Sequence, residues 1–373
     1  MKFFQFYFFL ITLAFSFFST ASQFSLTKQV PDNKLAINTD FNTLCSVANN
    51  TLAYRQLGNQ YDPAVNHANK LNEFGITAND IEKTLSKLCD IVKEDKQKSV
   101  KRLNDIAYLT RHFDFYRITS DTQHAASLSK QKPLLANLTA DKVLMTKYYV
   151  HLAKGSLNKT DDTPYALYAL PFDEQSLTIE QADAQKQSLT RFHYGKQTIL
   201  KGVLDTEKRA PVLVYLSRED LESALLQGTI VVEVAGEQRV YNVHRNNGIA
   251  YDRQIKPYQQ ERYWYFKQVN GILGYGKDAN NKIEVFPEVT FAGDIYQLGL
   301  GPLVFAQFDF KSHSEYRMAV MADTGGAFEN NLYQLDYLAG SYPGIKAYYN
   351  ANRHMPDYID AWFMIYKGEN QND

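Results

Sequence analysis

The sequence predicts a mainly β protein that begins with helices. Three observations indicate this fold class. Residues 41–112 carry apolar side chains at helical spacing, and from about residue 141 apolar residues recur with a period of two. The third is the stretch TIVVEVAGEQRVYNVH, in which two alternating runs flank a turn at residues 235–238, as in a β-hairpin. We expect N-terminal helices followed by a largely antiparallel β body.

The first residues, MKFFQFYFFLITLAFSFFSTAS, have the order of a secretory signal: one lysine, a long apolar run and then small residues. We expect residues 1–22 to be a signal peptide cleaved near Ala21 or Ser22, with an uncleaved anchor as the alternative. No cysteine follows the small residues, and no later run is apolar enough to span a bilayer. The pattern predicts a periplasmic or secreted protein. Residues 23–40 are polar, and we expect a disordered linker there.

The two cysteines fall on the predicted helices. Cys89 lies in an apolar face that follows a Thr77/Asp80 capping box, and Cys45 lies on a similar stripe of an earlier helix. In an oxidising compartment a Cys45–Cys89 disulfide is expected, with two buried free thiols as the alternative. Two cysteines this far apart, with no histidines at ligand spacing, predict no metal site, and no cofactor motif is present.

Charge and aromatic content restrict the class of ligand. Lys+Arg 40 against Asp+Glu 41 gives a net charge of −1, which excludes an electrostatic preference for nucleic acid. The 26 Tyr and 23 Phe suit carbohydrate surfaces, but they are equally ordinary in β-sheets. Trp264 and Trp362 fit core packing better than sugar stacking. For the pair His244-Arg245 we expect solvation rather than contact with a ligand carboxylate.

The stretch MADTGGAFENNLYQLD contains two carboxylates, Asp323 and Asp336, with two glycines after the first. An aspartic-protease site needs a second Asp-Thr-Gly copy, and the chain has none. Carbohydrate cleavage needs a carboxylic acid that stays protonated near neutral pH, which burial or a neighbouring carboxylate achieves. Gly325 and Gly326 permit a sharp turn and leave space beside Asp323. The alternative is that Asp323 and Asp336 are simply surface residues in turns.

Several segments, in order, resemble the membrane-bound lytic murein transglycosylase A family. AVMADTGGA resembles its Asp-Thr/Val-Gly-Gly-Ala signature, and TFAGDIYQLGLGPLVFA resembles the segment that holds the first of three aspartates, here Asp294. Asp336 stands where the third aspartate is found. LMTKYYVHL resembles the Thr-Gly-Tyr-Tyr-Glu-Pro strand. Gln227-Gly228-Thr229-Ile230 resembles the Gln-Gly-Ser-Gly hairpin, and residues 246–248 resemble Lys-Asn-Gly.

The resemblance covers roughly residues 41–366 and implies a fold. It implies a six-stranded double-psi β-barrel domain with the helices, formed by residues 41–147 plus 267–373. A second small β domain, residues 148–266, would be inserted, with a groove between the two domains.

The resemblance also implies an activity: cleavage of the MurNAc–GlcNAc β-1,4 bond of peptidoglycan without water, leaving a 1,6-anhydro end. It implies that Asp336 is the single acid/base, that Asp323 hydrogen-bonds to it or raises its pKa, and that Asp294 is a third, structural or polar, member. Gly325 and Gly326 follow Asp323 at the site. The remaining groove residues that it implies are Gln227, Gly228, Asn247 and Tyr149.

Departures from the family pattern cluster at groove positions. Phe328–Asn330 replace the usual Ile-Lys-Gly, and Val150-His151 replace Glu-Pro. The alternatives are therefore a non-catalytic peptidoglycan-binding protein and a hydrolase of another β-1,4 glycan. We expect a monomer with peptidoglycan strands as its partner and no transmembrane segment after signal cleavage.

Overall fold

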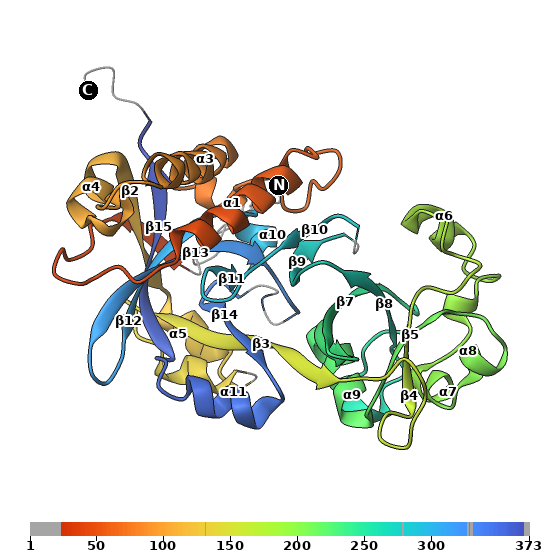
Figure 1. The fold of residues 1–373 in the computed structure, drawn as a ribbon. Helices are drawn as coiled ribbons and strands as arrows, with labels where there is room; N and C mark the ends of the chain where they lie inside the picture. The colour runs from red at the N-terminus through yellow and green to blue at the C-terminus, as the bar shows by residue number, and fades with distance from the viewer. Residues whose placement is uncertain (1–23, 131, 278–279, 327, 329–330, 369–373) are drawn as a thin grey trace, which may run out of the picture.

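A computed structural model describes residues 24–130, 132–277, 280–326, 328 and 331–368 (Figure 1). The predicted signal peptide lies outside the described residues. The predicted fold class is confirmed, because one sheet of 11 strands dominates the described residues and the long helices α1 (Phe41–Arg55) and α3 (Ala78–Glu94) lie in the N-terminal part of the chain. Figure 1 shows two regions, with strand β3 running from one into the other.

Six strands close into a barrel. Their order is β15-β12-β13-β11-β14-β3, and β3 pairs again with β15 to close the ring. The β11–β13 and β14–β3 pairs are parallel and the others are antiparallel. The barrel strands are β3 (Val143–Lys154), β11 (Thr290–Ala292), β12 (Leu303–Asp309), β13 (Ser314–Asp323), β14 (Gln334–Tyr342) and β15 (Tyr358–Tyr366).

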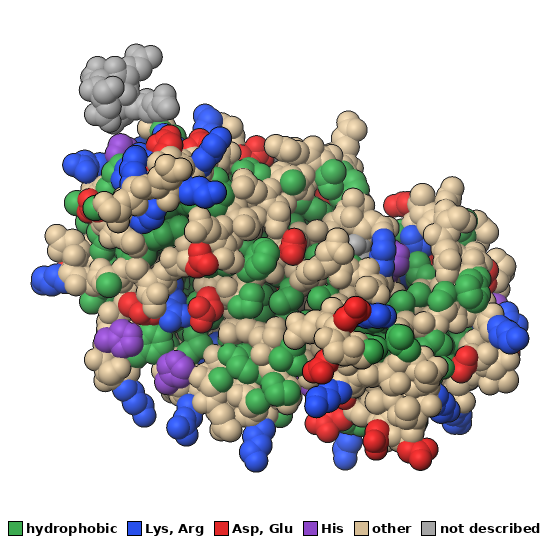
Figure 2. All heavy atoms as spheres, in the orientation of Figure 1, with side chains coloured by type: hydrophobic (Ala, Val, Ile, Leu, Met, Phe, Trp, Pro, Cys, Tyr) green, Lys and Arg blue, Asp and Glu red, His purple; other side chains and the backbone are tan. Residues whose placement is uncertain are grey.

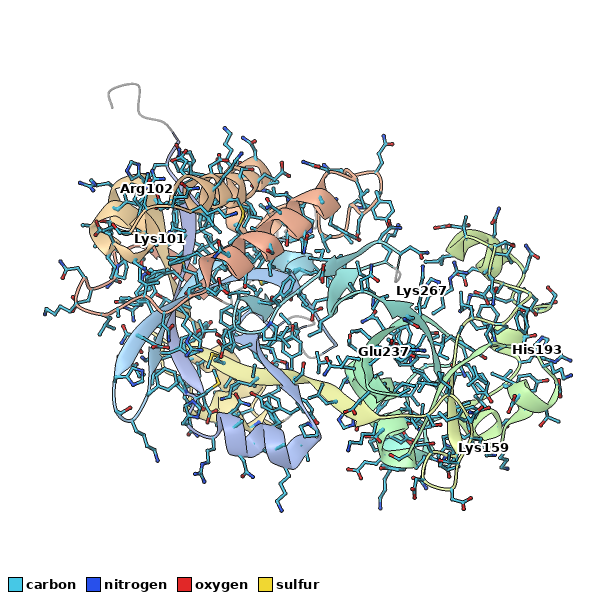
Figure 3. The ribbon with its side chains drawn as sticks, viewed as in Figure 1. Lys101, Arg102, Lys159, His193, Glu237 and Lys267 are labelled. Carbon is cyan, nitrogen blue, oxygen red and sulfur yellow. A yellow bond between two sulfur atoms is a disulfide. The ribbon has the colours of Figure 1, made fainter. Side chains whose placement is uncertain are left out.

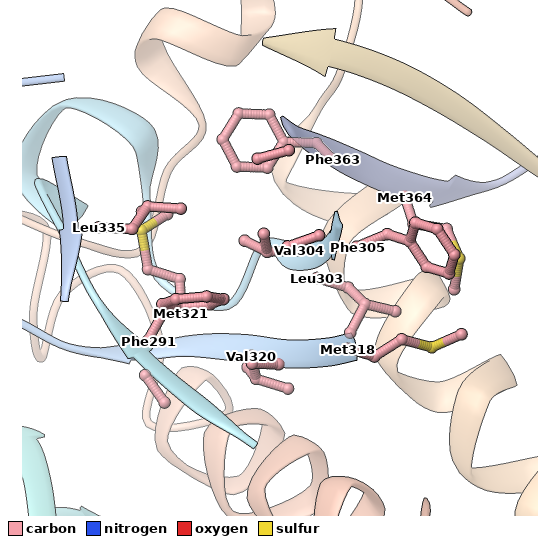
Figure 4. Packing of buried hydrophobic residues seen from close by; sticks show 14 of the residues in the cluster. Phe291, Leu303, Val304, Phe305, Met318, Val320, Met321, Leu335, Phe363 and Met364 are labelled. Atoms are coloured by element: carbon pink, nitrogen blue, oxygen red, sulfur yellow. The ribbon is translucent and has the colours of Figure 1, made fainter. Parts of the chain in front are cut away.

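Large apolar side chains pack on both faces of the barrel wall. Figure 4 shows Phe305, Met318, Met321 and Leu335 among them, and all four are at most 4% exposed. Because side chains alternate along a strand, Met318 and Met321 lie on opposite faces of β13. Each such side chain contributes about 1.5–3 kcal/mol when fully buried. Trp362 on β15 is 2% exposed, as expected for a core residue. This packing fixes the strand ends that carry the polar residues described below.

Helices cover one side of the barrel. Asp40 accepts hydrogen bonds from the first turn of α1 (Phe41–Arg55), and Thr77 and Asp80 form the predicted capping box of α3 (Ala78–Glu94). The predicted Cys45–Cys89 disulfide joins these two helices (Figure 3). Shorter helices complete this region: α2 (Asn69–Asn72), η1 (Arg102–Asn104), α4 (Ile106–His112), α5 (Thr122–Ser127), η2 (Pro133–Asn137), α10 (Ile295–Leu298) and α11 (Ile345–Asn352).

The prediction of a disordered linker is wrong for its described part. Residues Phe24–Lys28 form strand β1, which pairs antiparallel with β2 (Phe113–Ser120), and β2 in turn pairs with β15. Phe24 and Leu26 are buried and the residues between and after them are exposed. Five residues of alternating buried and exposed side chains are too few to predict a strand from the sequence. Pairing with β2 stabilises this strand.

Residues 151–266, which we call the insert, form the second region. His151 pairs with both β14 and β6, and beyond it β3 pairs with β6 alone, so one strand belongs to both regions. The expected domain boundaries fall inside β3 and inside β8. The insert elements are β4 (Tyr165–Tyr168), α6 (Ile179–Ala184), η3 (Thr190–Phe192), α7 (Lys196–Leu200), α8 (Val203–Thr206), β5 (Val212–Leu216), α9 (Arg218–Gln227), β6 (Thr229–Val234), β7 (Glu237–Asn246), η4 (Pro257–Gln259) and β8 (Trp264–Val269).

The predicted hairpin is present as β6 and β7, and Ala235 and Gly236 form its turn with positive φ. The expectation that Arg245 is solvated is wrong. Its guanidinium is buried and lies 2.9 Å from Glu174, which also binds Arg191 at 2.7 Å. One buried carboxylate thus joins two arginines inside the insert, where unpaired charges would be costly.

After the insert, β9 (Leu273–Gly276) and β10 (Lys282–Glu284) form a short antiparallel pair. Figure 2 shows charges of both signs spread over the molecular face that it displays. Within the described residues, no helix has the length and apolar character needed to cross a membrane.

Candidate active site

A cleft of about 470 Å³ lies between the barrel and the insert. This volume is in the range of small-molecule and glycan sites. The barrel contributes residues of β3, β11 and β14, the end of β13, and the β9–β10 pair. The insert contributes the corner between α9 and β6, and part of β7. The predicted site residues that line the cleft are Tyr149, Gln227, Gly228, Asp323, Gly325, Gly326 and Asp336.

The strand register brings Asp323 and Asp336 together. Asp323 is the last residue of β13 and Asp336 lies near the start of β14, while β11 runs between these strands. Ala292 on β11 is the register partner of both aspartates. Two strand spacings separate their backbones, about 10 Å. Both side chains line the same cleft, so the sequence gap of thirteen residues becomes a short distance in space.

Asp323 is surrounded by hydrogen-bond donors. The Tyr148 hydroxyl donates to its Oδ2 at 2.9 Å, and the Thr324 backbone N–H donates to its Oδ1 at 2.8 Å. Burial raises the pKa of Asp323 to about 6, while these two donors and the nearby Lys282 act in the opposite direction. The donors stabilise the charged form. At neutral pH Asp323 is therefore mainly an anion.

Asp336 is also buried, but it has fewer hydrogen-bond donors than Asp323. Burial raises its pKa to about 7, the Thr146 hydroxyl lowers it, and the charge of Asp323 raises it further. Its Oδ1 is shielded from solvent and has no hydrogen-bond partner among the described residues. A buried carboxyl oxygen without a donor disfavours ionisation. Asp336 thus keeps its proton to a higher pH than Asp323 does.

Asp294 lies outside the cleft. Only 2% of it is exposed, and it caps helix α10 by accepting from the Gln297 backbone N–H at 3.2 Å and the Gln297 amide at 2.8 Å. Burial raises its pKa. The neighbouring Gly293 carbonyl accepts a hydrogen bond from the Thr324 hydroxyl at 2.7 Å, next to Asp323. These contacts fit the structural role that the resemblance allowed for Asp294.

The predicted groove residues differ in their placement. Tyr149 lines the cleft and stacks on Tyr348 with ring centroids 4.7 Å apart. Gly228 lines the cleft and also ends α9 at φ 79°, a conformation that favours glycine. The space expected beside the glycine pair is present, because a Cβ at Gly326 would meet no atom of the described residues within 4 Å, its two chain neighbours aside.

The prediction that Asn247 lines the groove is wrong. It is 2% exposed, and its side chain joins backbone segments inside the insert. Its Nδ2 donates to the carbonyls of Tyr194 at 3.0 Å and Glu261 at 2.9 Å, and its Oδ1 accepts from the Tyr263 N–H at 3.0 Å. With these groups engaged and the residue buried, Asn247 stabilises the insert.

Four residues near the carboxylates were not predicted: Thr146, Tyr148, Lys282 and Tyr296. Lys282 on β10 donates to the Asn242 Oδ1 at 2.7 Å and to the Val243 carbonyl at 3.3 Å, so it joins the barrel side to the insert across the cleft. Tyr148 is next to Tyr149 in the motif LMTKYYVHL. Successive side chains of a strand point to opposite faces, and this alternation was the only sequence signal that distinguished the two tyrosines.

A second cavity, of about 620 Å³, shares Leu273 and Lys282 with the cleft. Lys267 on β8, labelled in Figure 3, lines it together with Asn50 and Glu284. The two cavities lie along the β9–β10 pair and extend the concave surface beyond the carboxylates. Among the described residues, no group of three or more His, Cys, Asp or Glu side chains is placed to hold a metal ion.

The solved structures that superpose on this chain include lytic transglycosylases. A membrane-bound lytic murein transglycosylase from Agrobacterium tumefaciens superposes with a TM-score of 0.61 at 13% identity, over 93% of this chain and 98% of that chain. E. coli MltA with bound chitohexaose gives 0.58 at 15% identity, over 93% and 95%. MltA from Neisseria gonorrhoeae gives 0.54 at 15% identity, over 88% and 89%.

No protein-family model matches the sequence, and no curated protein matches it. At these identities the likeness establishes the fold. The chain has the MltA lytic transglycosylase fold, with its double-psi barrel, over nearly its whole described length.

Proposed function

We propose that the protein is a lytic transglycosylase that cleaves the MurNAc–GlcNAc β-1,4 bond of peptidoglycan. The observation that carries this proposal is the pair of unequal carboxyls in one cleft. Asp336 has a pKa of about 7 and a shielded Oδ1 without a partner, beside an anionic Asp323. A protonated acid next to a charged carboxylate is the arrangement that glycosidic bond cleavage needs.

In the proposed reaction one carboxyl acts twice. Asp336 gives its proton to the glycosidic oxygen as the C1–O bond breaks and positive charge develops at C1. The Asp336 carboxylate then takes the proton of the C6 hydroxyl of the same sugar, and O6 bonds to C1 to close the 1,6-anhydro ring. The proton is back on Asp336, and no water is consumed. Because the nucleophile belongs to the substrate, a high effective concentration assists the second step.

Asp323 serves this cycle through its charge. Its anion raises the pKa of Asp336 before proton transfer. The Tyr148 hydroxyl and the Thr324 N–H keep Asp323 ionised and hold it in place. Gln227, Gly228 and Tyr149, which line the same cleft, are the proposed glycan contacts.

We place the enzyme outside the cytoplasm, in the periplasm or secreted, as a monomer. The Cys45–Cys89 disulfide supports this, because disulfides persist in oxidising compartments. The signal-like residues 1–22 and the peptidoglycan substrate point to the same compartment.

The test is mass spectrometry of purified sacculi after incubation with the protein. We expect muropeptides that end in 1,6-anhydro-MurNAc, and their loss in Asp336→Asn protein that still unfolds in a cooperative thermal transition. Products with only reducing ends identify a hydrolase instead. Sedimentation with sacculi without any soluble product identifies a peptidoglycan-binding protein, and turnover of chitin or cellulose alone identifies another glycan.

A further inference from the structure

Three tyrosine rings form a row that leads into the cleft. Tyr54 on α1 lies edge to face with Tyr275 on β9, with ring centroids 5.7 Å apart. Tyr275 lies edge to face with Tyr296 on α10, with centroids 6.2 Å apart. Tyr54 is 4% exposed, whereas Tyr296 is 51% exposed and lines the cleft together with Tyr275. The row therefore begins in the interior and ends in the open space beside the carboxylates.

A buried carboxylate holds the inner part of this row. Asp62 is 3% exposed, and its Oδ2 accepts hydrogen bonds from the Tyr54 hydroxyl at 2.7 Å and from the Tyr275 hydroxyl at 2.8 Å. Hydrogen bonds to a carboxylate are stronger than those between neutral groups. One oxygen atom thus fixes the two inner rings, and Tyr296 packs on the second of them.

The loop that contains this carboxylate, residues 57–68 between α1 and α2, also positions α10. The Leu300 N–H, just after α10, donates to the Val65 carbonyl at 2.9 Å. A Cβ at Gly299, the last cap of α10, would collide with the backbone of the loop, so the two segments are in direct contact. The same loop therefore sets the position of the helix that carries Tyr296.

The two cleft tyrosines lie close to the carboxylates. Gly274 precedes Tyr275 on β9, and a Cβ at Gly274 would lie 3.3 Å from the Cβ of Asp323. On the other side, the Thr324 hydroxyl donates to the Gly293 carbonyl at 2.7 Å, two residues before α10. Both elements that carry the cleft tyrosines thus touch the end of β13. A glycan that reaches the carboxylates therefore places a neighbouring sugar beside the exposed end of the row.

The chemistry of a glycan fits an exposed tyrosine ring. In a β-1,4-linked chain of GlcNAc-type sugars, the linkages and most polar groups lie around the edge of each pyranose ring, so that its faces present C–H groups. The face of an aromatic ring carries partial negative charge and attracts the weakly positive hydrogens of such groups. Ligand sites combine aromatic walls with a few polar groups, and the cleft has both.

We propose that Tyr296, supported by Tyr275, is a stacking platform for a GlcNAc-type pyranose ring next to the cleaved bond, and that Asp62 is a positioning residue that holds this platform. This inference rests on the proposed function, which supplies the glycan. The platform contributes to binding and not to proton transfer. Its loss therefore raises Kd and KM and leaves the chemistry of Asp336 in place.

The first experiment is isothermal titration calorimetry with a β-1,4-linked GlcNAc hexamer. We expect Tyr296→Ala to weaken binding about tenfold, because the stacked ring is lost, and Tyr296→Phe to bind like the wild type, because the ring remains. Tyr258→Ala is the matched control: Tyr258 on η4 is 50% exposed and is not among the described residues that line the cleft. An unchanged Kd in Tyr296→Ala, an equal loss in Tyr258→Ala, or a wild type that does not bind the hexamer would overturn the platform.

The role of Asp62 is tested in a double-mutant cycle with the same hexamer. We expect Asp62→Ala to weaken binding severalfold when Tyr296 is present, and to add no further loss in Tyr296→Ala protein. Equal losses in both backgrounds would mean that Asp62 does not act through the platform. Thermal unfolding checks that each variant is folded. If Asp62→Ala is unfolded, Tyr275→Phe takes its place, because it removes one of the two hydrogen bonds and retains the ring.

The last measurement is the release of anhydro-muropeptides from soluble glycan strands. In Tyr296→Ala we expect a KM about tenfold higher at nearly unchanged kcat, the result of losing a contact made equally in the bound substrate and in the transition state. A lower kcat at unchanged KM would contradict a binding platform. A wild type that binds the hexamer but releases no anhydro product defeats the proposed function, whereas the Kd comparison still decides the role of Tyr296. The two failures are therefore distinguishable.

Discussion

The two sides of the cleft contribute different chemistry. The barrel side supplies the ionisable groups Asp323, Asp336 and Lys282, together with Tyr148. The insert side supplies Gln227, backbone at Gly228 and apolar or amide side chains, while its buried ion pairs around Glu174 are turned inward. Strand register in the closed barrel thus brings the ionisable groups together, whereas the insert closes the cleft from the opposite side.

The largest expected effect is on the barrel side. We expect Asp336→Asn to lower the rate of anhydro-product release at least about 10³-fold, because the only proton donor in the proposed reaction is removed. Asp294→Asn is the comparison, since asparagine also caps helices well and Asp294 does not line the cleft. It should retain activity within about tenfold. Equal losses in both variants would contradict the assignment of Asp336.

The second prediction concerns pH. The proposed acid must be protonated, so activity falls as pH rises above the Asp336 pKa of about 7. Below about 6, protonation of Asp323 removes the charge that supports Asp336. We expect a bell-shaped profile of the turnover rate whose two apparent pKa values belong to the coupled pair. A rate that still increases above pH 8 would contradict it.

The same pKa values affect stability. Both aspartates have higher pKa values in the folded state than the ordinary value of 3.8, so the folded state binds more protons between about pH 4 and 7. Their contribution to stability therefore decreases as pH rises through this window. Asp336→Asn removes one such group, and its melting temperature relative to the wild type should be higher at pH 8 than at pH 4.

The fourth prediction concerns the link between the two sides. Lys282→Met removes the bonds to Asn242 and Val243 and one positive charge near Asp323. We expect KM to rise about tenfold, because the insert wall loses its tie, and the acidic limb of the pH profile to move to higher pH. Lys159→Met, a change of an exposed insert lysine, is the control. A normal KM in Lys282→Met would show that the wall is held by other contacts.

Local structure was predictable in both regions, because its signals are close together in sequence. The capping box at Thr77 and Asp80, beside the barrel, and the hairpin of β6 and β7, in the insert, follow from residues near one another in sequence. The two aspartates could be named from a motif. Their different pKa values could not, because these depend on Tyr148 and Thr146, which another strand brings alongside.

The errors have a common physical origin. Asn247 was expected in the groove from its motif position, but burial inside the insert decides its role. Arg245 looked solvated because its partner Glu174 lies 71 positions earlier. Residues 24–28 looked too polar and too short for a strand, but they form one because they pair with β2. In each case a long-range partner outweighs the local pattern.

The smallest expected effects distinguish a glycine on each side of the cleft. Gly228 on the insert side has φ 79°, so Gly228→Ala forces a side chain into the left-handed region and should cost about 1 kcal/mol of folding free energy. On the barrel side, a Cβ at Gly326 meets no atom within 4 Å in the described part of the chain, so Gly326→Ala should change stability by less than about 0.5 kcal/mol. Thermal unfolding measures both. A tenfold rise of KM in Gly326→Ala at unchanged stability would mean that the glycan passes directly against the barrel backbone, and the barrel side would then bind the glycan through its backbone as well as through Tyr296.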